Sequence, residues 1–258
     1  PIPRTLALTI YGALDVSVIN ELPSGRKKII TSHRNDNSRL KVFGFLSKII
    51  SSGQQAYIVY PLIEESETKD YKDLMDGFKS LKRYFPDVQI GILHGRMKSE
   101  NKDYEMKRFA EGKSEILVST TVIEVGVDVP NATVIVIESA ERFGLSQLHQ
   151  LRGRVGRGKK QGTCILLYKK NLSESAKKRI KILKSSNDGF FIAEEDMKLR
   201  GFGDLLGFKQ SGVKNFKLAD PVHNEDLFIL AEQEIRKIEE ENIAVSYTHL
   251  RAHETRED

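Results

Sequence analysis

The chain has 258 residues, of which 39% are hydrophobic and 30% are charged, which is enough apolar material for one or two globular domains. No stretch approaches the roughly 20 apolar residues of a membrane-spanning helix, and the first residues lack the features of a signal peptide, so we expect no membrane partner and a cytoplasmic location. The formal net charge of +5 is only mildly basic, but it is unevenly distributed.

Short apolar runs alternate with amphipathic stretches from residue 27 to residue 168. We predict strands at 28–32, 56–60, 89–93, 115–119, 133–138 and 163–168. The stretches between them predict helices near 38–52, 71–85, 99–111 and 146–151. This alternation is typical of an α/β fold, a mainly parallel sheet with helices on both faces and ligand sites at the carboxyl ends of the strands. The single cysteine, Cys164, falls in the last strand, which predicts a buried thiol and excludes a disulfide framework.

The pattern changes after residue 168. Ser173 can cap a helix in which Ala176, Ile180 and Leu183 form one apolar stripe while the lysines face outward. A glycine-punctuated segment follows, and a last helix is predicted over 225–241, with Asn224 as its cap. These segments predict a helical appendage to the α/β domain.

Basic residues gather in two segments. Six Lys or Arg and no acidic residue lie between Arg142 and Lys160, and seven lie between Lys169 and Lys184 against the single Glu174. Such clustering suits contact with phosphate or nucleic acid. For the second segment, a solvated helix face is an equally good interpretation.

Two arginines three residues apart, Arg154 and Arg157, alternate with glycines directly after a predicted helix. Guanidinium groups can stabilise the charge that gathers on a departing γ-phosphate, and glycines allow close backbone approach. The run Gln-x-x-Gly-Arg-x-Gly-Arg resembles the sixth motif of superfamily-two helicases. The resemblance implies that Gln150 senses ATP and that Arg154 and Arg157 reach its γ-phosphate, with Arg157 as the arginine finger. The alternative is a basic loop that binds any polyanion.

The segment 117–130 resembles the fifth helicase motif, in which a buried strand runs into hydroxylated residues and then into a Gly-x-Asp turn. The resemblance implies that Ser119, Thr120 and Thr121 face DNA, and that Gly126 and Asp128 face the nucleotide, where the aspartate can accept from ribose hydroxyls. In isolation, the threonine pair is more often a packing feature and Gly-x-Asp more often a turn.

His94, Gly95 and Arg96 follow directly after a predicted strand, where superfamily-two relatives contact the nucleic-acid backbone. The resemblance therefore implies a DNA-contact role for these three residues. A histidine that only supports the structure is the alternative.

The opening residues 1–7 resemble the end of the third motif of RecG helicases and of the transcription-repair coupling translocase, so we expect a fragment whose first lobe, with the Walker A and B motifs, is absent. The segments 14–26, 60–67 and 186–190 favour RecG. The resemblance covers residues 1 to about 240.

On this resemblance, residues 1–25 connect to the first lobe, 26–171 form a RecA-like second lobe, 172–243 form a helical translocation-coupling extension, and 244–258 are a disordered or spurious tail. Arg200 and Gln210 are the implied coupling residues. The sequence departs from the family pattern nearby, because Phe202 replaces a proline and Phe208-Lys209 replaces Thr-Arg. These departures loosen a turn and remove a bidentate contact.

The resemblance implies an ATP- and Mg²⁺-dependent DNA helicase that unwinds branched DNA, regresses stalled replication forks and migrates Holliday junctions. ATP and Mg²⁺ would be bound mainly by the first lobe, so this chain is expected to be inert alone and to hold no metal site of its own. A monomer in the bacterial cytoplasm, associated with the nucleoid and with a single-strand-binding protein as a possible partner, is also implied. The alternatives are a transcription-repair coupling translocase and a non-catalytic lobe that binds nucleic acid.

Overall fold

A computed structural model describes residues 27–61, 67–120, 128–169 and 171–200, together with 230, 233–235 and 237. The chain divides into two compact units, of which the first comprises residues 1–2 and 20–199. This first unit contains most of the described residues and all of the strands described here. The predicted connector, the tail and most of the predicted last helix lie outside the described residues, although residues 230, 233–235 and 237 of that helix are helical.

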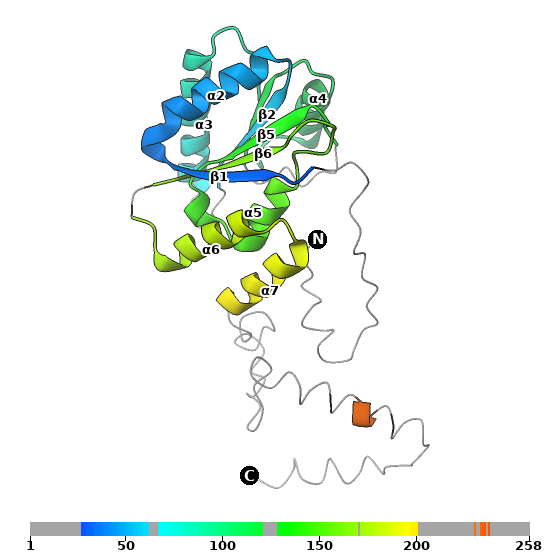
Figure 1. The fold of residues 1–258 in the computed structure, drawn as a ribbon. Helices are drawn as coiled ribbons and strands as arrows, with labels where there is room; N and C mark the ends of the chain where they lie inside the picture. The colour runs from blue at the N-terminus through cyan, green and yellow to red at the C-terminus, as the bar shows by residue number, and fades with distance from the viewer. Residues whose placement is uncertain are drawn as a thin grey trace, which may run out of the picture. The chain divides into compact units, whose positions relative to one another are not determined.

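The core of the first unit is a six-stranded parallel sheet in the order β1-β6-β5-β2-β4-β3 (Figure 1). The strands are β1 (Ile30–Asn35), β2 (Gln55–Val59), β3 (Ile90–Leu93), β4 (Ile116–Ser119), β5 (Ala132–Ile137) and β6 (Thr163–Tyr168). All six predicted strands are confirmed, but β1 begins and ends later than predicted because Ile30 to Asn35 pair in register with Thr163 to Tyr168. Since every pair is parallel, the carboxyl ends share one edge of the sheet.

Helices cover both faces of the sheet, as predicted. They are α2 (Arg39–Ser51), α3 (Glu67–Tyr84), α4 (Ser99–Ala110), α5 (Leu145–Arg152), α6 (Glu174–Ser185) and α7 (Gly189–Arg200). Buried side chains of α2 and α3 pack on one face of the sheet, and those of α4, α5 and α6 pack on the other. The fold is therefore a RecA-like lobe, which confirms the predicted fold class.

The α6 helix begins as predicted, because the Ser173 side chain accepts a hydrogen bond from the Ala176 amide at 3.2 Å. Ala176, Ile180 and Leu183 are buried. Ile180 and Leu183 share a hydrophobic cluster with the sheet, and so does Ile192 of α7. This helical pair therefore packs directly on the lobe.

The apolar pattern of the glycine-punctuated segment did not predict α7, although the family resemblance implied a helical extension over residues 172–243. Its apolar residues do not form one stripe, because Phe190 and Phe191 are exposed while Ile192 and Ala193 are buried. Tertiary packing thus stabilises a helix that the hydrophobic period does not reveal.

Cys164 is fully buried in β6, as predicted, and burial raises the pKa of its thiol to about 12. A reactive thiolate is therefore excluded at this position. None of the helices in the described ranges has the length and apolar character needed to cross a membrane.

Candidate functional site

The residues that the sequence assigns to DNA lie at the carboxyl edge of the sheet. His94 follows β3, Ser119 ends β4, and the Thr120 amide donates to the Leu93 carbonyl at 3.1 Å. Ser119 and Thr120 are 0% and 2% exposed, and neither hydroxyl has a hydrogen-bond partner among the described residues. Both hydroxyls therefore lie just beneath the surface of this edge.

His94 and Arg96 meet on one aromatic ring, that of Tyr71 in α3. The His94 ring packs edge-on against Tyr71 with centroids 5.1 Å apart, and the Arg96 guanidinium lies 5.1 Å from the Tyr71 centroid. Gly95 lies between them, with open space where a Cβ would stand. Burial, followed by the charges of Arg96 and Lys102, lowers the pKa of His94 and favours its neutral ring. Sequence reasoning missed Tyr71, since a tyrosine in an amphipathic helix resembles a packing residue.

The residues that the sequence assigns to the nucleotide lie at the opposite edge. Asp128 precedes β5, while Arg154 and Arg157 lie between α5 and β6. The Arg157 Nη1 is 3.7 Å from the Asp128 Oδ1, and its Nε donates to the Gly153 carbonyl at 3.2 Å. Asp128, Arg154 and Arg157 therefore lie away from the carboxyl ends of the strands, where the general expectation for this fold puts ligand sites.

Close backbone packing explains the glycines beside these arginines. Gly156 has a φ of 71°, which an L side chain rarely adopts, and a Cβ on Gly158 would stand 2.7 Å from the Pro130 carbonyl oxygen. The loop that carries Arg157 can therefore lie directly against the segment that carries Asp128.

Tyr57 of β2 lies within electrostatic range of the same residues. Burial raises the pKa of the Tyr57 phenol to about 12, although the positive charges of Arg157 and Arg154 oppose the shift. The ring is 1% exposed and packs against Phe109, with centroids 4.8 Å apart. A neutral, well-packed phenol therefore lies close to the arginine pair.

Gln150 is exposed on α5, one helical turn before Arg154. Thr121, Gly126 and Gln210 lie outside the described residues. Arg200 ends α7, and its side chain is also outside the description. The structure thus brings together Asp128, Arg154 and Arg157, and separately His94, Gly95, Arg96, Ser119 and Thr120.

Arg152, between Gln150 and Arg154, is a structural residue that sequence reasoning missed. Its side chain is buried at 1% exposure, and its Nη1 donates to the carbonyls of Leu183 and Ser186 at 2.5 and 2.8 Å. These carbonyls belong to the last turn and C-cap of α6, where a cation is favourable. Burial lowers the pKa of Arg152. Arg152 follows the buried residues Leu145 and Leu148 by seven and four positions. This helical spacing is the sequence signal that places Arg152 on the inner side of α5.

The second missed feature is a partly buried ion pair. Arg39 of α2 binds Glu138, after β5, through two hydrogen bonds of 2.6 and 2.8 Å, and it also binds Asp36 at 2.6 Å. Burial raises the pKa of Glu138, and the Arg39 charge opposes that shift. The pair fixes the start of α2 to the carboxyl end of β5, so it supports the shape of the edge at which His94, Ser119 and Thr120 lie.

In the described ranges, no three His, Cys, Asp or Glu side chains cluster in a way that suits a metal ion.

Family models match two parts of the chain. The helicase conserved C-terminal domain matches residues 41–159, and the C-terminal part of domain 3 of the ATP-dependent DNA helicase RecG matches residues 186–249. Together they cover most of the described lobe and the segment that follows it.

Individual relatives agree with the models. The chain is 51% identical to the ATP-dependent DNA helicase RecG of Synechocystis, in a match that covers 94% of this chain and 30% of that protein. It is 50% identical to RecG of Bacillus subtilis, in a match that covers 87% of this chain and 33% of that protein. It thus spans about a third of the length of these relatives. The solved structure of RecG bound to a three-way DNA junction superposes with a TM-score of 0.69 at 46% identity, covering 88% of this chain and 29% of that one. The chain belongs to the RecG family of ATP-dependent DNA helicases.

Proposed function

We propose that this chain is the second motor lobe of an ATP-dependent DNA helicase. In this proposal Arg154, Arg157, Gln150, Gly126 and Asp128 face the nucleotide. The DNA-side residues are His94, Gly95, Arg96, Ser119, Thr120 and Thr121. The observation that carries the proposal is the approach of Arg157 to Asp128 within 3.7 Å, because it unites the fifth and sixth motifs at one edge while the described DNA-side residues lie at the other.

The residues present fit a bound triphosphate. The Arg157 side chain is 30% exposed and already lies near a carboxylate oxygen, so its remaining donors can reach phosphate oxygens. ATP would supply the phosphoanhydride bond whose cleavage drives the motor. Arg157 and Arg154 would stabilise the charge developing on the γ-phosphate, and Asp128 would orient the sugar. Mg²⁺ and the Walker residues would come from a first lobe.

The extension from residue 172 to 243 would transmit the motion of the lobe to DNA, with Arg200 and Gln210 as its coupling residues. The buried contacts of α6 with α5 through Arg152 support a mechanical link. The whole protein would unwind branched DNA, regress stalled forks and migrate Holliday junctions, as a monomer near the bacterial nucleoid that can meet a single-strand-binding protein. The RecG relative solved on a three-way junction supports a branched substrate.

The two alternatives are weaker on these observations. A transcription-repair coupling translocase shares the helicase motifs, but the domain model and the relatives named above are RecG. A non-catalytic lobe would have no use for an arginine pair beside Asp128, with the close glycine packing that supports it.

The test is Arg157→Ala in a two-lobe protein that contains this sequence. We expect ATP binding to stay close to wild type while DNA-stimulated turnover falls by about 10³-fold or more, because an arginine finger acts mainly in the transition state. The 258-residue chain alone should hydrolyse no ATP. Turnover by the isolated chain, or a variant that loses only binding affinity, would contradict the proposed role.

A further inference from the structure

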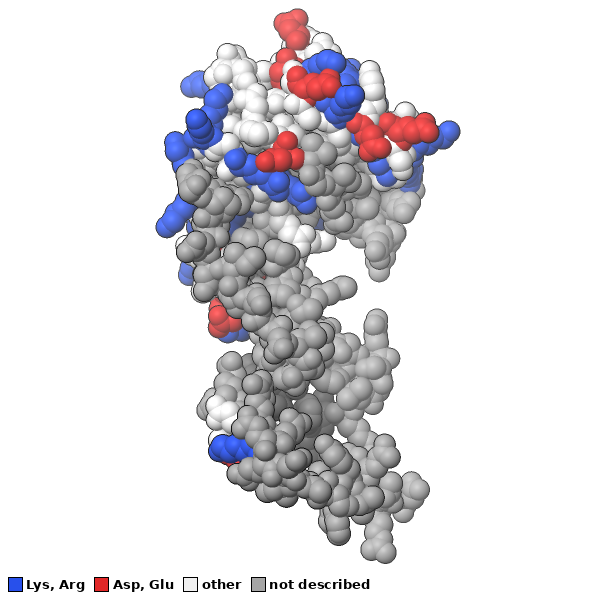
Figure 2. Space-filling view, turned by 90° about the vertical axis from the view of Figure 1, so that its right-hand side faces the viewer, with Lys and Arg blue, Asp and Glu red and all other residues white. Residues whose placement is uncertain are grey.

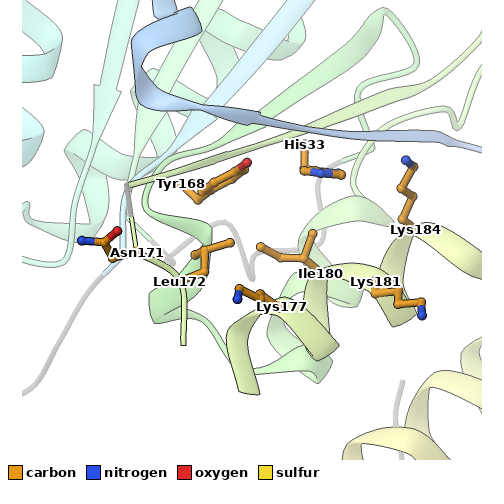
Figure 3. Close-up of a pocket in the computed structure, with 8 residues that line it drawn as sticks. All are labelled: His33, Tyr168, Asn171, Leu172, Lys177, Ile180, Lys181 and Lys184. Carbon is orange, nitrogen blue, oxygen red and sulfur yellow. The ribbon is translucent and has the colours of Figure 1, made fainter. Parts of the chain in front are cut away.

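A pocket of about 740 Å³ lies between the β1–β6 side of the sheet and α6 (Figure 3). The rings of His33 in β1 and Tyr168 in β6 lie on its sheet side. On the helix side are Ile180 and three lysines. These residues belong to neither of the two groups of site residues described above, so the pocket is a separate feature of the lobe.

The pocket lining is strongly basic. Lys177, Lys181 and Lys184 follow one another at i, i+4 and i+7 along α6, a spacing that places them on one face of the helix. The lining contains no carboxylate, although Lys177 also pairs with Glu174 at 2.6 Å. On the face drawn in Figure 2, by contrast, acidic and basic side chains of the described residues are interspersed. The lysine-lined pocket therefore favours an anion.

Two rings complete the lining. His33 and Tyr168 have centroids 5.9 Å apart and planes tilted by 36°. The Nδ1 of His33 is buried and has no hydrogen-bond partner among the described residues. Ile180 and Leu172 add apolar surface. Rings and apolar side chains beside lysines provide a stacking surface for a base and ammonium groups for phosphates.

We propose that this pocket binds an unpaired nucleotide of a single-stranded DNA segment, with the neighbouring phosphates on the α6 lysines. The inference rests on the proposed function in that it takes DNA as the substrate. The cavity volume lies in the range of about 300–1,000 Å³ that suits small ligands, and a duplex would not present a base to the rings. The three lysines span about 10 Å of helix, which is longer than a single phosphate group.

The first experiment measures binding of a fluorescent oligo-dT to the 258-residue chain, without ATP, over a series of salt concentrations. We expect Lys181→Gln/Lys184→Gln to bind about tenfold more weakly and to reduce the salt slope by about 1.4, since each lost phosphate contact contributes about 0.7 for single strands. The matched control is Lys178→Gln/Lys48→Gln, whose exposed lysines lie outside the pocket lining. Equal losses in both double variants would overturn the proposal.

Competition and cross-linking decide the identity of the ligand. A duplex of equal length, inorganic phosphate and ADP should each displace oligo-dT poorly; efficient displacement by any of them would overturn the assignment to an unpaired strand. An oligonucleotide carrying 5-iodouracil should cross-link to Tyr168 or His33 of the unaltered chain, and cross-links found only elsewhere would refute the site even if the lysine variants misfold. Because no ATP is present, failure here is distinguishable from failure of the motor assignment, which Arg157→Ala tests separately.

Discussion

The guanidinium of Arg157 lies 3.7 Å from the carboxylate of Asp128, although 28 residues separate them in the chain. The contact is possible because Arg157 lies in the segment that leads into β6 and Asp128 in the segment that leads into β5. These two strands are neighbours and parallel, so both segments lie at the same edge of the sheet. Their side chains are 30% and 55% exposed, so the pair contributes little to stability and remains accessible to a ligand.

Asp128→Asn should therefore change nucleotide recognition more than folding. We expect the free energy of unfolding to change by less than about 1 kcal/mol, as for exposed ion pairs. In a two-lobe protein the affinity for ATP should fall several-fold, because a carboxylate accepts more strongly than an amide from ribose hydroxyls. The measurement is equilibrium titration with ATP and with 2′-deoxy-ATP. The penalty should be smaller with the deoxy nucleotide; an equal penalty for both would contradict a contact to the 2′-hydroxyl.

Arg152→Met should destabilise the lobe by about 2–4 kcal/mol. The substitution leaves two carbonyls of α6, those of Leu183 and Ser186, without a buried donor, and each such loss costs about 1–3 kcal/mol. Urea unfolding of the 258-residue chain measures the effect. Arg108→Met is the control, since the partly exposed Arg108 pairs with Glu105 at 3.2 Å and lies 5.8 Å from the Tyr104 ring centroid, and its loss should cost less than about 1 kcal/mol. Similar losses in both variants would show that Arg152 does not anchor α6.

Stability should decline as the pH falls below about 6.5, in part because of His94. Burial, followed by the charges of Arg96 and Lys102, lowers the folded-state pKa of His94 below its ordinary value of 6.5. The unfolded chain then binds the proton more readily, so the stability that is present above pH 6.5 is lost as the pH falls toward the folded-state pKa.

Free energies of unfolding measured at pH 7.5, 6.5 and 5.5 test the role of His94. The variant His94→Gln should lose less stability than the unaltered chain as the pH falls. His33 has a pKa lowered first by burial and then by Lys184 and Arg34, so His33→Gln should act in the same direction. An unchanged pH profile in the double variant would exclude both histidines as its cause.

Arg200→Ala or Gln210→Ala in a two-lobe protein should separate ATP hydrolysis from DNA unwinding. A coupling element touches neither the nucleotide nor most DNA phosphates, so branched-DNA binding and some DNA-stimulated ATPase should remain while junction unwound per ATP falls sharply. Binding should keep its salt dependence, which phosphate contacts set. ATP hydrolysed and junction resolved are measured in one preparation. If both variants unwind junctions with wild-type efficiency per ATP, the coupling role is wrong. If both lose DNA binding completely, the segment is a DNA-contact surface instead.

Local signals in the sequence predicted much of the lobe. The period of the apolar runs predicted all six strands and four helices of the parallel sheet domain, because buried strands and amphipathic helices are encoded within a few residues. The cap at Ser173 and the stripe of Ala176, Ile180 and Leu183 are local in the same way, and both are confirmed. The helicase motifs also supplied the residues of the candidate sites, whose roles stay predictions.

The tertiary structure alone decided how those residues are arranged. The approach of Arg157 to Asp128 depends on strand order, because it requires β5 and β6 to be neighbours, and the burial of Arg152 depends on where α6 ends against α5. The α7 helix has no clear apolar stripe, and its buried Ile192 packs in a cluster with sheet residues that are distant in sequence. The pocket between His33 and Lys184 joins segments about 150 residues apart. No local period in the sequence can encode such a pocket, because contacts between distant segments are set by packing of the whole domain.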